Sequence, residues 1–129
     1  GDHILWQRAS RTPYVPSPLL VGGVLYCLSH YQGVLSRLEV ATGEEPTGPF
    51  RLGNLRDIYA SPVSADGRLY VTDRTGVTLV LSEAKEPAFL ASNLLEDRFS
   101  ASPALAGKDL FLRGERFLYR IAQAEPTAP

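Results

Sequence analysis

The stretch ASPVSADGRLYVT, residues 60–72, decides the fold because its pattern occurs three times along the chain. In each copy a Ser-Pro pair is followed, eight residues later, by a leucine and an aromatic residue. The three copies are Ser17-Pro18 with Leu25-Tyr26, Ser61-Pro62 with Leu69-Tyr70, and Ser102-Pro103 with Leu110-Phe111. They begin 44 and 41 residues apart, which predicts three repeats of one structural unit.

The second copy shows what the unit contains. Asp66-Gly67 is a hairpin turn signal because both residues tolerate positive φ. Apolar and β-branched runs at residues 60–64, 68–72, 77–81 and 88–91 predict four strands. Four consecutive antiparallel strands per repeat of about 40–45 residues are typical of one β-propeller blade.

The other copies follow the same plan but differ in completeness. The first has its third strand at residues 34–40 and a fourth at 50–52, whereas the third stops after a strand at 117–121. A lone strand at residues 4–8 (Ile4 to Arg8) precedes the first copy. The sequence therefore predicts an all-β chain of three four-stranded antiparallel blades, half or a sector of a ring. The predicted bounds are about 9–54, 55–95, and 96–122 plus strand 4–8, with a disordered tail at 123–129.

The prolines fit this arrangement. Proline lacks a backbone donor, so a strand tolerates it only at an edge or at the first residue. A proline at the same position of every copy therefore predicts that this strand is the innermost one, facing the central channel.

Composition excludes several classes of function. The 129 residues carry 13 basic and 14 acidic side chains. Binding to nucleic acid phosphates needs an excess of basic side chains, so we expect no nucleic acid partner. No apolar run is long enough for a membrane span, and the single cysteine, Cys27, excludes an internal disulfide. The chain holds no methionine and starts at Gly1, which we interpret as a processed or excised piece.

The repeat resembles a known family. Ser-Pro followed by Gly-x-Leu-Tyr-Val, and the segment Leu38 to Glu44 with Ala-Thr-Gly-Glu, resemble the pyrroloquinoline-quinone-like (PQQ-like) repeat over roughly residues 4–122. The family includes quinoprotein alcohol dehydrogenases and an outer-membrane assembly lipoprotein, so the resemblance implies a propeller in an extracytoplasmic (periplasmic or secreted) bacterial protein. The family's docking tryptophan corresponds here to Thr47, and Trp6 is a candidate for such a residue from a blade just upstream.

The resemblance also allows a test for cofactor chemistry. The family's dehydrogenases hold the quinone with a stacking tryptophan, a Glu/Asn/Asp metal set and an adjacent Cys-Cys pair. This chain has one tryptophan, one cysteine and two asparagines, so we expect no cofactor, no metal, no catalytic residues and no enzymatic activity. Cys27 lies in a predicted strand, so we expect it to pack as a small hydrophobic side chain. His3 and His30 have no second ligand at the spacing of a metal site, so we expect surface roles for both.

Recurring polar residues have structural explanations. Ser17, Ser61 and Ser102 occur once per copy, which favours strand capping over catalysis. The aspartates at predicted turns are expected to accept hydrogen bonds from neighbouring amides; they are Asp57, Asp66, Asp73, Asp97 and Asp109. Tyr26, Tyr70 and Phe111 share one blade position, which predicts packing between blades.

Aromatic and arginine residues in or beside loops form the candidate binding face, because both types are favoured at interfaces. They are Tyr14, Tyr31, Tyr59, Arg56, Arg74 and Arg98; a solvated rim is the alternative interpretation. The leading hypothesis is a non-enzymatic β-propeller scaffold that binds a protein or peptide partner. The alternatives are a fragment of a quinoprotein-like oxidoreductase whose active site lies in other blades, and a carbohydrate-binding propeller.

Three blades do not close a ring, which normally holds about 4–8. Two chains would give six, with strand 4–8 completing the last blade of a partner, so a strand-exchanged homodimer is one prediction. An excised sector of a longer propeller is the other. Either way, we expect a free three-blade unit to leave apolar flanks open at Leu25-Tyr26 and at residues 117–119.

Overall fold

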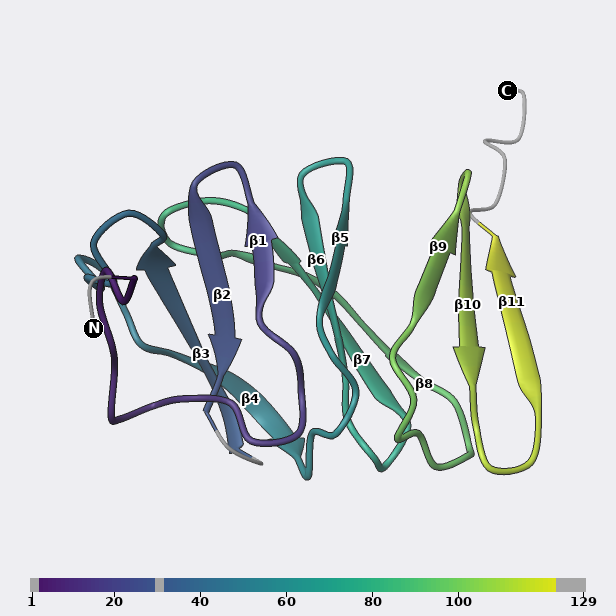
Figure 1. The fold of residues 1–129 in the computed structure, drawn as a ribbon. Coiled ribbons are helices and arrows are strands. Elements are labelled where there is room, and N and C mark those ends of the chain that lie inside the picture. The colour runs from purple at the N-terminus through teal and green to yellow at the C-terminus, as the bar shows by residue number, and fades with distance from the viewer. Residues whose placement is uncertain (1–2, 30–31, 123–129) are drawn as a thin grey trace, which may run out of the picture.

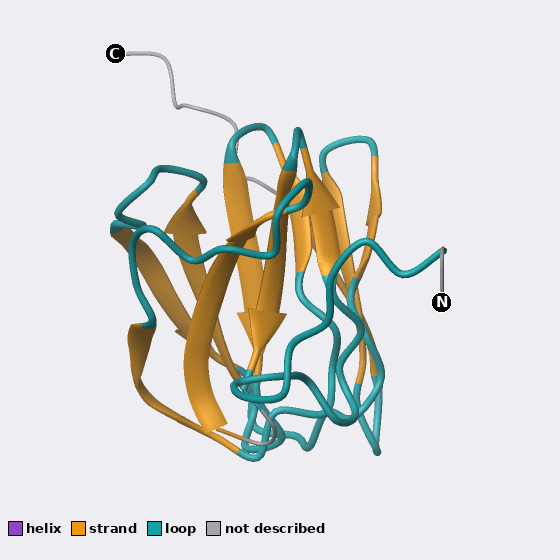
Figure 2. Cartoon of the chain, turned by 60° about the vertical axis from the view of Figure 1, so that its left-hand side comes forward, coloured by secondary structure: helices purple, strands orange, loops and turns teal. Residues whose placement is uncertain are grey.

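The computed structural model describes residues 3–29 and 32–122, and this part of the chain contains strands and loops but no helix (Figure 2). Eleven strands follow one another. They are β1 (Leu19–Val21), β2 (Val24–Leu28), β3 (Gln32–Glu39), β4 (Phe50–Arg56), β5 (Val63–Ala65), β6 (Arg68–Thr72), β7 (Val77–Ser82), β8 (Phe89–Leu94), β9 (Ala104–Ala106), β10 (Asp109–Arg113) and β11 (Leu118–Ala122). No helix that could cross a membrane is found among these described residues.

The strands form three antiparallel sheets that stand side by side in chain order (Figure 1). Blade 1 is β1-β2-β3-β4, blade 2 is β5-β6-β7-β8, and blade 3 is β9-β10-β11. Each sheet is a simple meander, and the expected all-β propeller fold is confirmed. The prediction of a fourth strand for blade 3 is wrong for the described chain: residues 4–8 lie beside blade 1 and pair with no strand, so blade 3 has three strands.

Local backbone chemistry explains the inner hairpins. Asp66 and Gly67 have φ of 50° and 73°, and they join Ala65 to its partner Arg68 across a two-residue turn. Gly22 and Gly23 take the same left-handed conformation in blade 1. Positive φ at both central residues suits the twist of a tight hairpin, so the predicted turns are confirmed.

The Ser-Pro motif has a role that connects the blades. The Ser17 amide donates to Ser61 Oγ at 2.8 Å, and the Ser61 amide donates to Ser102 Oγ at 2.9 Å. We call this chain of bonds the serine ladder. The proline after each serine directly precedes β1, β5 or β9, the edge strand of its sheet, where a missing donor is tolerated.

Two apolar cores lie between the blades. The larger joins Tyr26, Leu28 and Leu35 of blade 1 to Leu69 and Leu81 of blade 2. The smaller lies between blades 2 and 3 around Phe99, Leu110 and Leu112. Tyr26 and Tyr70 therefore pack between blades as expected. Phe111 is the exception: it lies between Leu110 and Leu112 in β10, and alternation turns it to the other face of the sheet.

The N-terminal segment covers the outer side of blade 1 (Figure 1). The Trp6 indole donates to the Val40 carbonyl at 2.9 Å, and its ring lies against Gly43, where a Cβ would come within 2.6 Å. Arg8 forms an ion pair with Glu45, and Arg11 reaches the same carboxylate at 3.0 Å. The expectation that both flanks are open is therefore wrong for blade 1, where this segment lies on the sheet.

Candidate functional site

Four of the six candidate residues gather where strands end on one side of the molecule. Arg56 ends β4, Tyr59 lies in the β4–β5 connection, Arg74 in the β6–β7 turn, and Arg98 in the β8–β9 connection. These elements all reach the lower side of Figure 1. We call these four residues the loop face. Tyr14 precedes β1 and is largely exposed, whereas Tyr31 lies outside the described residues.

Blades 1 and 2 meet at the centre of the loop face. The Arg74 guanidinium lies over the Tyr59 ring, 4.4 Å from its centroid. Such a cation–π contact holds both side chains in one geometry. The Arg74 Nε atom is enclosed and has no hydrogen-bond partner among the described residues. The stack therefore forms a rigid surface of mixed charge and aromatic character.

Each arginine of the loop face has its backbone amide bonded to an aspartate. The Arg56 amide donates to Asp73 Oδ2 at 3.2 Å, and the Arg98 amide donates to Asp97 Oδ1 at 2.8 Å. The Arg74 amide donates to the backbone carbonyl of Asp57 at 3.2 Å. The Arg56 bond joins blade 1 to the β6–β7 turn of blade 2, and the Arg74 bond joins that turn to the β4–β5 connection. The loops are thus fixed while the Arg56 and Arg98 side chains stay exposed.

Asp73 is the polar centre of the β6–β7 turn and is only 1% exposed. Its Oδ1 accepts hydrogen bonds from the Thr75 amide at 2.9 Å, the Thr75 hydroxyl at 2.7 Å and the Val77 amide at 3.1 Å. Its Oδ2 accepts the Arg56 bond described above. The predicted role of this aspartate, accepting hydrogen bonds from nearby amides, is confirmed, but the link to Arg56 in the preceding blade was not foreseen.

Asp97 joins blade 2 to the β10–β11 turn of blade 3. It accepts bonds from the Phe117 amide at 3.1 Å and the Tyr119 hydroxyl at 3.0 Å, and from the amides of Arg98 and Arg116. Burial raises the pKa of Asp97, but these hydrogen bonds outweigh it and place that pKa below the usual range. Burial and the bond to Asp97 raise the pKa of Tyr119. A Cβ on Gly114 would lie 2.2 Å from Asp97 Oδ2, which explains the glycine in this turn.

The remaining aspartates differ from one another. Asp66 and Asp57 both have a φ of 50° and lie in connections between strands, as expected. Asp109 does not lie in a turn: it begins β10 and pairs with Arg120 on β11 at 2.7 Å. The prediction for Asp109 is therefore wrong, because the two-residue turn closes at Gly107-Lys108 and leaves Asp109 in the ladder.

Of the candidate nucleophile and ligands, the structure describes Cys27 and His3. Cys27 is buried on blade 1, and burial raises its pKa, with the nearby Arg8 and Glu45 charges acting in opposite directions. A protonated buried thiol is a poor nucleophile. His3 is exposed and His30 lies outside the described residues. Among the described residues, no group of three or more His, Cys, Asp or Glu side chains could hold a metal.

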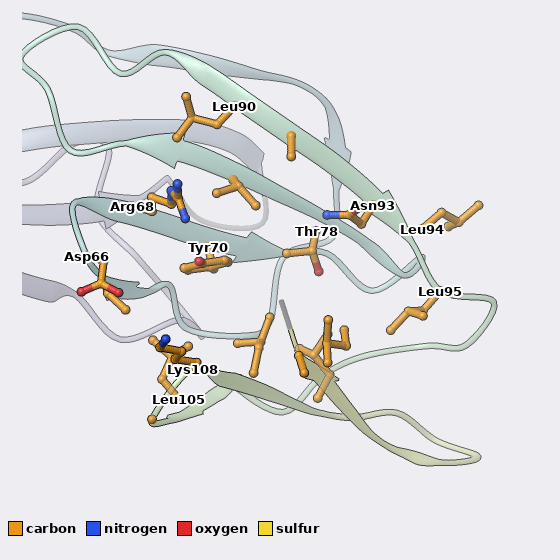
Figure 3. Close-up of a pocket in the computed structure, with 18 residues that line it drawn as sticks. Asp66, Arg68, Tyr70, Thr78, Leu90, Asn93, Leu94, Leu95, Leu105 and Lys108 are labelled. Carbon is orange, nitrogen blue, oxygen red and sulfur yellow. The ribbon is translucent and has the colours of Figure 1, made fainter. Parts of the chain in front are cut away.

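A groove of about 860 Å³ opens between blades 2 and 3, and sequence reasoning missed it (Figure 3). Tyr70 from blade 2 and Leu105 from blade 3 line opposite walls, and Leu90 and Leu94 of β8 line the outer part. Every residue of β8 is exposed, whereas Leu52 and Leu55 of the corresponding β4 are buried. The sequence feature that could have predicted this groove is the missing fourth strand of the third copy.

Comparisons with known proteins give a likeness to solved structures. No family model matches the chain, and no curated protein matches it. Among solved structures, the chain is similar to BamB from Moraxella catarrhalis, with 15% identity and a TM-score of 0.47. The match covers 89% of this chain and 46% of the other, so the chain spans about half the length of that protein.

Proposed function

We propose that the chain is part of a non-enzymatic β-propeller scaffold that binds a protein or peptide partner on the loop face. The observation that carries the proposal is the Arg74–Tyr59 stack, 4.4 Å from guanidinium to ring centroid. The loop face also carries two exposed arginines, Arg56 at the end of β4 and Arg98 in the β8–β9 connection. Tyrosine and arginine are the side chains that most often anchor protein interfaces.

The support for a binding role lies in how these residues are held. All three arginines have backbone amides bonded to aspartates, so the loops are in place before a partner arrives. A surface that is already ordered loses less conformational entropy on binding. The buried, protonated thiol of Cys27 supports a role without covalent chemistry.

Charge reversal on the loop face tests the proposal. A display library of linear peptides is selected on the wild-type chain, and the selected peptides are measured against Arg56→Glu and Arg98→Glu. Each variant is expected to weaken binding about tenfold, or about 1.4 kcal/mol. Lys85→Glu is the matched control, because Lys85 is exposed in the β7–β8 turn at the opposite ends of the strands. Peptides that bind all four proteins equally, or a selection that yields none, would contradict the proposal.

The same proposal places the scaffold outside the cytoplasm of a bacterium. Its support is the resemblance of the repeat to the PQQ-like family. A secretion or lipoprotein signal encoded upstream of the segment is the expected finding. A native start codon just before residue 1, with no such signal, would count against this location.

A further inference from the structure

Residues 4–8 have the side-chain pattern of a strand but belong to no sheet in the described chain. Trp6 and Arg8 are half-buried against blade 1, where they contact Gly43 and Glu45. The residues between and before them, Leu5 and Gln7, point outward, and Leu5 is 88% exposed. Alternation with a period of two is the signature of a strand with two different faces. Over residues 5–8 one side of the segment is covered and the other is bare, and Ile4 before them is 62% exposed.

The position of the segment corresponds to that of an outer strand. Thr47, just before the outer strand β4, donates to the Lys85 carbonyl in the β7–β8 turn of the next blade, at 3.3 Å. Trp6 precedes Thr47 by 41 residues, which is one of the two repeat spacings. Trp6 contacts the β3–β4 turn of blade 1, at Val40 and Gly43, in the equivalent way. The segment therefore lies where the outer strand of a blade preceding blade 1 would lie (Figure 1).

In the described chain, blade 3 lacks an outer strand, which is what residues 4–8 resemble. β11 is the edge of its sheet and pairs with β10 alone among the described strands, whereas β3 and β7 each have an outer neighbour. Beside this edge lies the groove lined by Leu90, Leu94 and Ile121, all partly exposed. Figure 3 shows Leu90 and Leu94 along its margin. An extended segment whose bare side carries Leu5 fits such an edge by adding a strand.

The serine ladder could also continue from the last blade of one copy to the first blade of another. Ser17 and Ser102, at the two ends of the ladder, are both exposed, and each takes part in one of its two bonds. In both internal steps an amide of one blade meets the hydroxyl of the next. A blade 3 placed before blade 1 would let Ser102 of one copy donate to Ser17 of another.

We propose that the occupant of the β11 edge is residues 4–8 of a second copy of this chain. In that arrangement Trp6 and Arg8 stay on their own blade 1, and Leu5 enters the groove between blades 2 and 3 of the partner copy. The contact is head-to-tail, and two such contacts close a two-fold ring of six blades, within the normal range of about 4–8. The bare faces at both ends of the single chain are then covered together.

Light scattering of the full 129-residue chain at tens of micromolar tests the proposal. The expected mass is twice 14.1 kDa. Leu5→Asp is expected to give a folded monomer, because Leu5 is almost fully exposed in the single chain and adds little to its stability. Leu20→Asp is the matched control: Leu20 is an exposed leucine on the inner strand β1, and this variant stays a dimer.

Cross-linking checks the register independently of stability. Cys27 is buried, so cysteines placed at the surface are the reactive ones. An equimolar mixture of Leu5→Cys and Leu94→Cys chains is expected to cross-link with a short bismaleimide, and Leu5→Cys with Leu20→Cys is not. A monomer, a dimer that persists with Leu5→Asp, or equal cross-linking of both mixtures would overturn the proposal. A monomer would instead assign these surfaces to further blades of a longer chain. Binding at the loop face does not depend on this result.

Discussion

Removing the Asp73 side chain is expected to destabilise the contact between blades 1 and 2. In Asp73→Ala three backbone amides (Arg56, Thr75 and Val77) lose their acceptor, together with the Thr75 hydroxyl. A buried donor left without a partner costs about 1–3 kcal/mol. Thr75 is exposed, so water replaces part of the loss on that side. We therefore expect the free energy of unfolding to fall by about 3 kcal/mol in total.

The variant Asp73→Asn tests the contributions of the two carboxylate oxygens separately. Asparagine keeps an oxygen at the Oδ1 position, where three of the four bonds are made, and places an N–H group opposite the Arg56 amide. The expected loss is about 1–2 kcal/mol, between wild type and Asp73→Ala.

Urea denaturation followed by far-ultraviolet circular dichroism measures the free energy of unfolding of wild type and of both variants, and so ranks their stabilities. Asp57→Asn is the control: it is the same substitution in the neighbouring connection, where asparagine also tolerates the φ of 50°. Its expected change is under about 0.5 kcal/mol. The reasoning is refuted if Asp73→Asn costs as much as Asp73→Ala, or if Asp73→Ala matches the control.

Four further outcomes are expected. Ser61→Ala removes the acceptor of the Ser17 amide at a solvent-exposed rung, and its stability in urea is expected to drop by about 0.5–1.5 kcal/mol, whereas a loss above about 3 kcal/mol would contradict this assignment. Because the pKa of Asp97 is lower in the folded chain, its contribution to stability is present above the unfolded value of about 3.9 and is lost as pH falls through the folded value. Asp97→Asn should therefore lose less stability than wild type below about pH 4, and identical acid titrations of unfolding would argue against the hydrogen-bond network. The buried Cys27 thiol should react slowly with a disulfide reagent in the folded protein and faster in Trp6→Ala, which loosens the covering segment; equal rates would mean that the segment does not protect it. Reconstitution with pyrroloquinoline quinone and calcium should give no saturable dye reduction, and its appearance would overturn the non-enzymatic proposal.

Local signals account for the parts of the fold that the sequence predicted. Asp66-Gly67 and Gly22-Gly23 permit positive φ, so the turns follow from residues next to one another. Strand β6 begins and ends at residues 68 and 72 as predicted, because its β-rich run is bounded by turn residues on both sides. The strand expected at residues 4–8 is not formed, because a strand needs a neighbouring strand to pair with and no local sequence pattern supplies one.

The candidate site was predictable only in part. Residue type and loop position singled out Arg56, Arg74 and Arg98, but nothing in the sequence indicated that an aspartate would hold each amide. The stack of Arg74 on Tyr59 joins the β6–β7 turn to the β4–β5 connection, and the groove beside β11 depends on how blade 3 stands against β8.

The sequence by itself determined the repeat, the order of the strands, the hairpin turns and the edge position of each Ser-Pro motif. Each of these follows from backbone preferences of adjacent residues or from the regular spacing of apolar side chains. Only the tertiary structure decided that Ser61 bonds across 44 and 41 residues, that Trp6 lies on Gly43, and that Asp73 reaches Arg56. Those contacts join residues far apart in the sequence, and their distances are set by how the sheets and the N-terminal segment pack on one another, which no local pattern in the chain encodes.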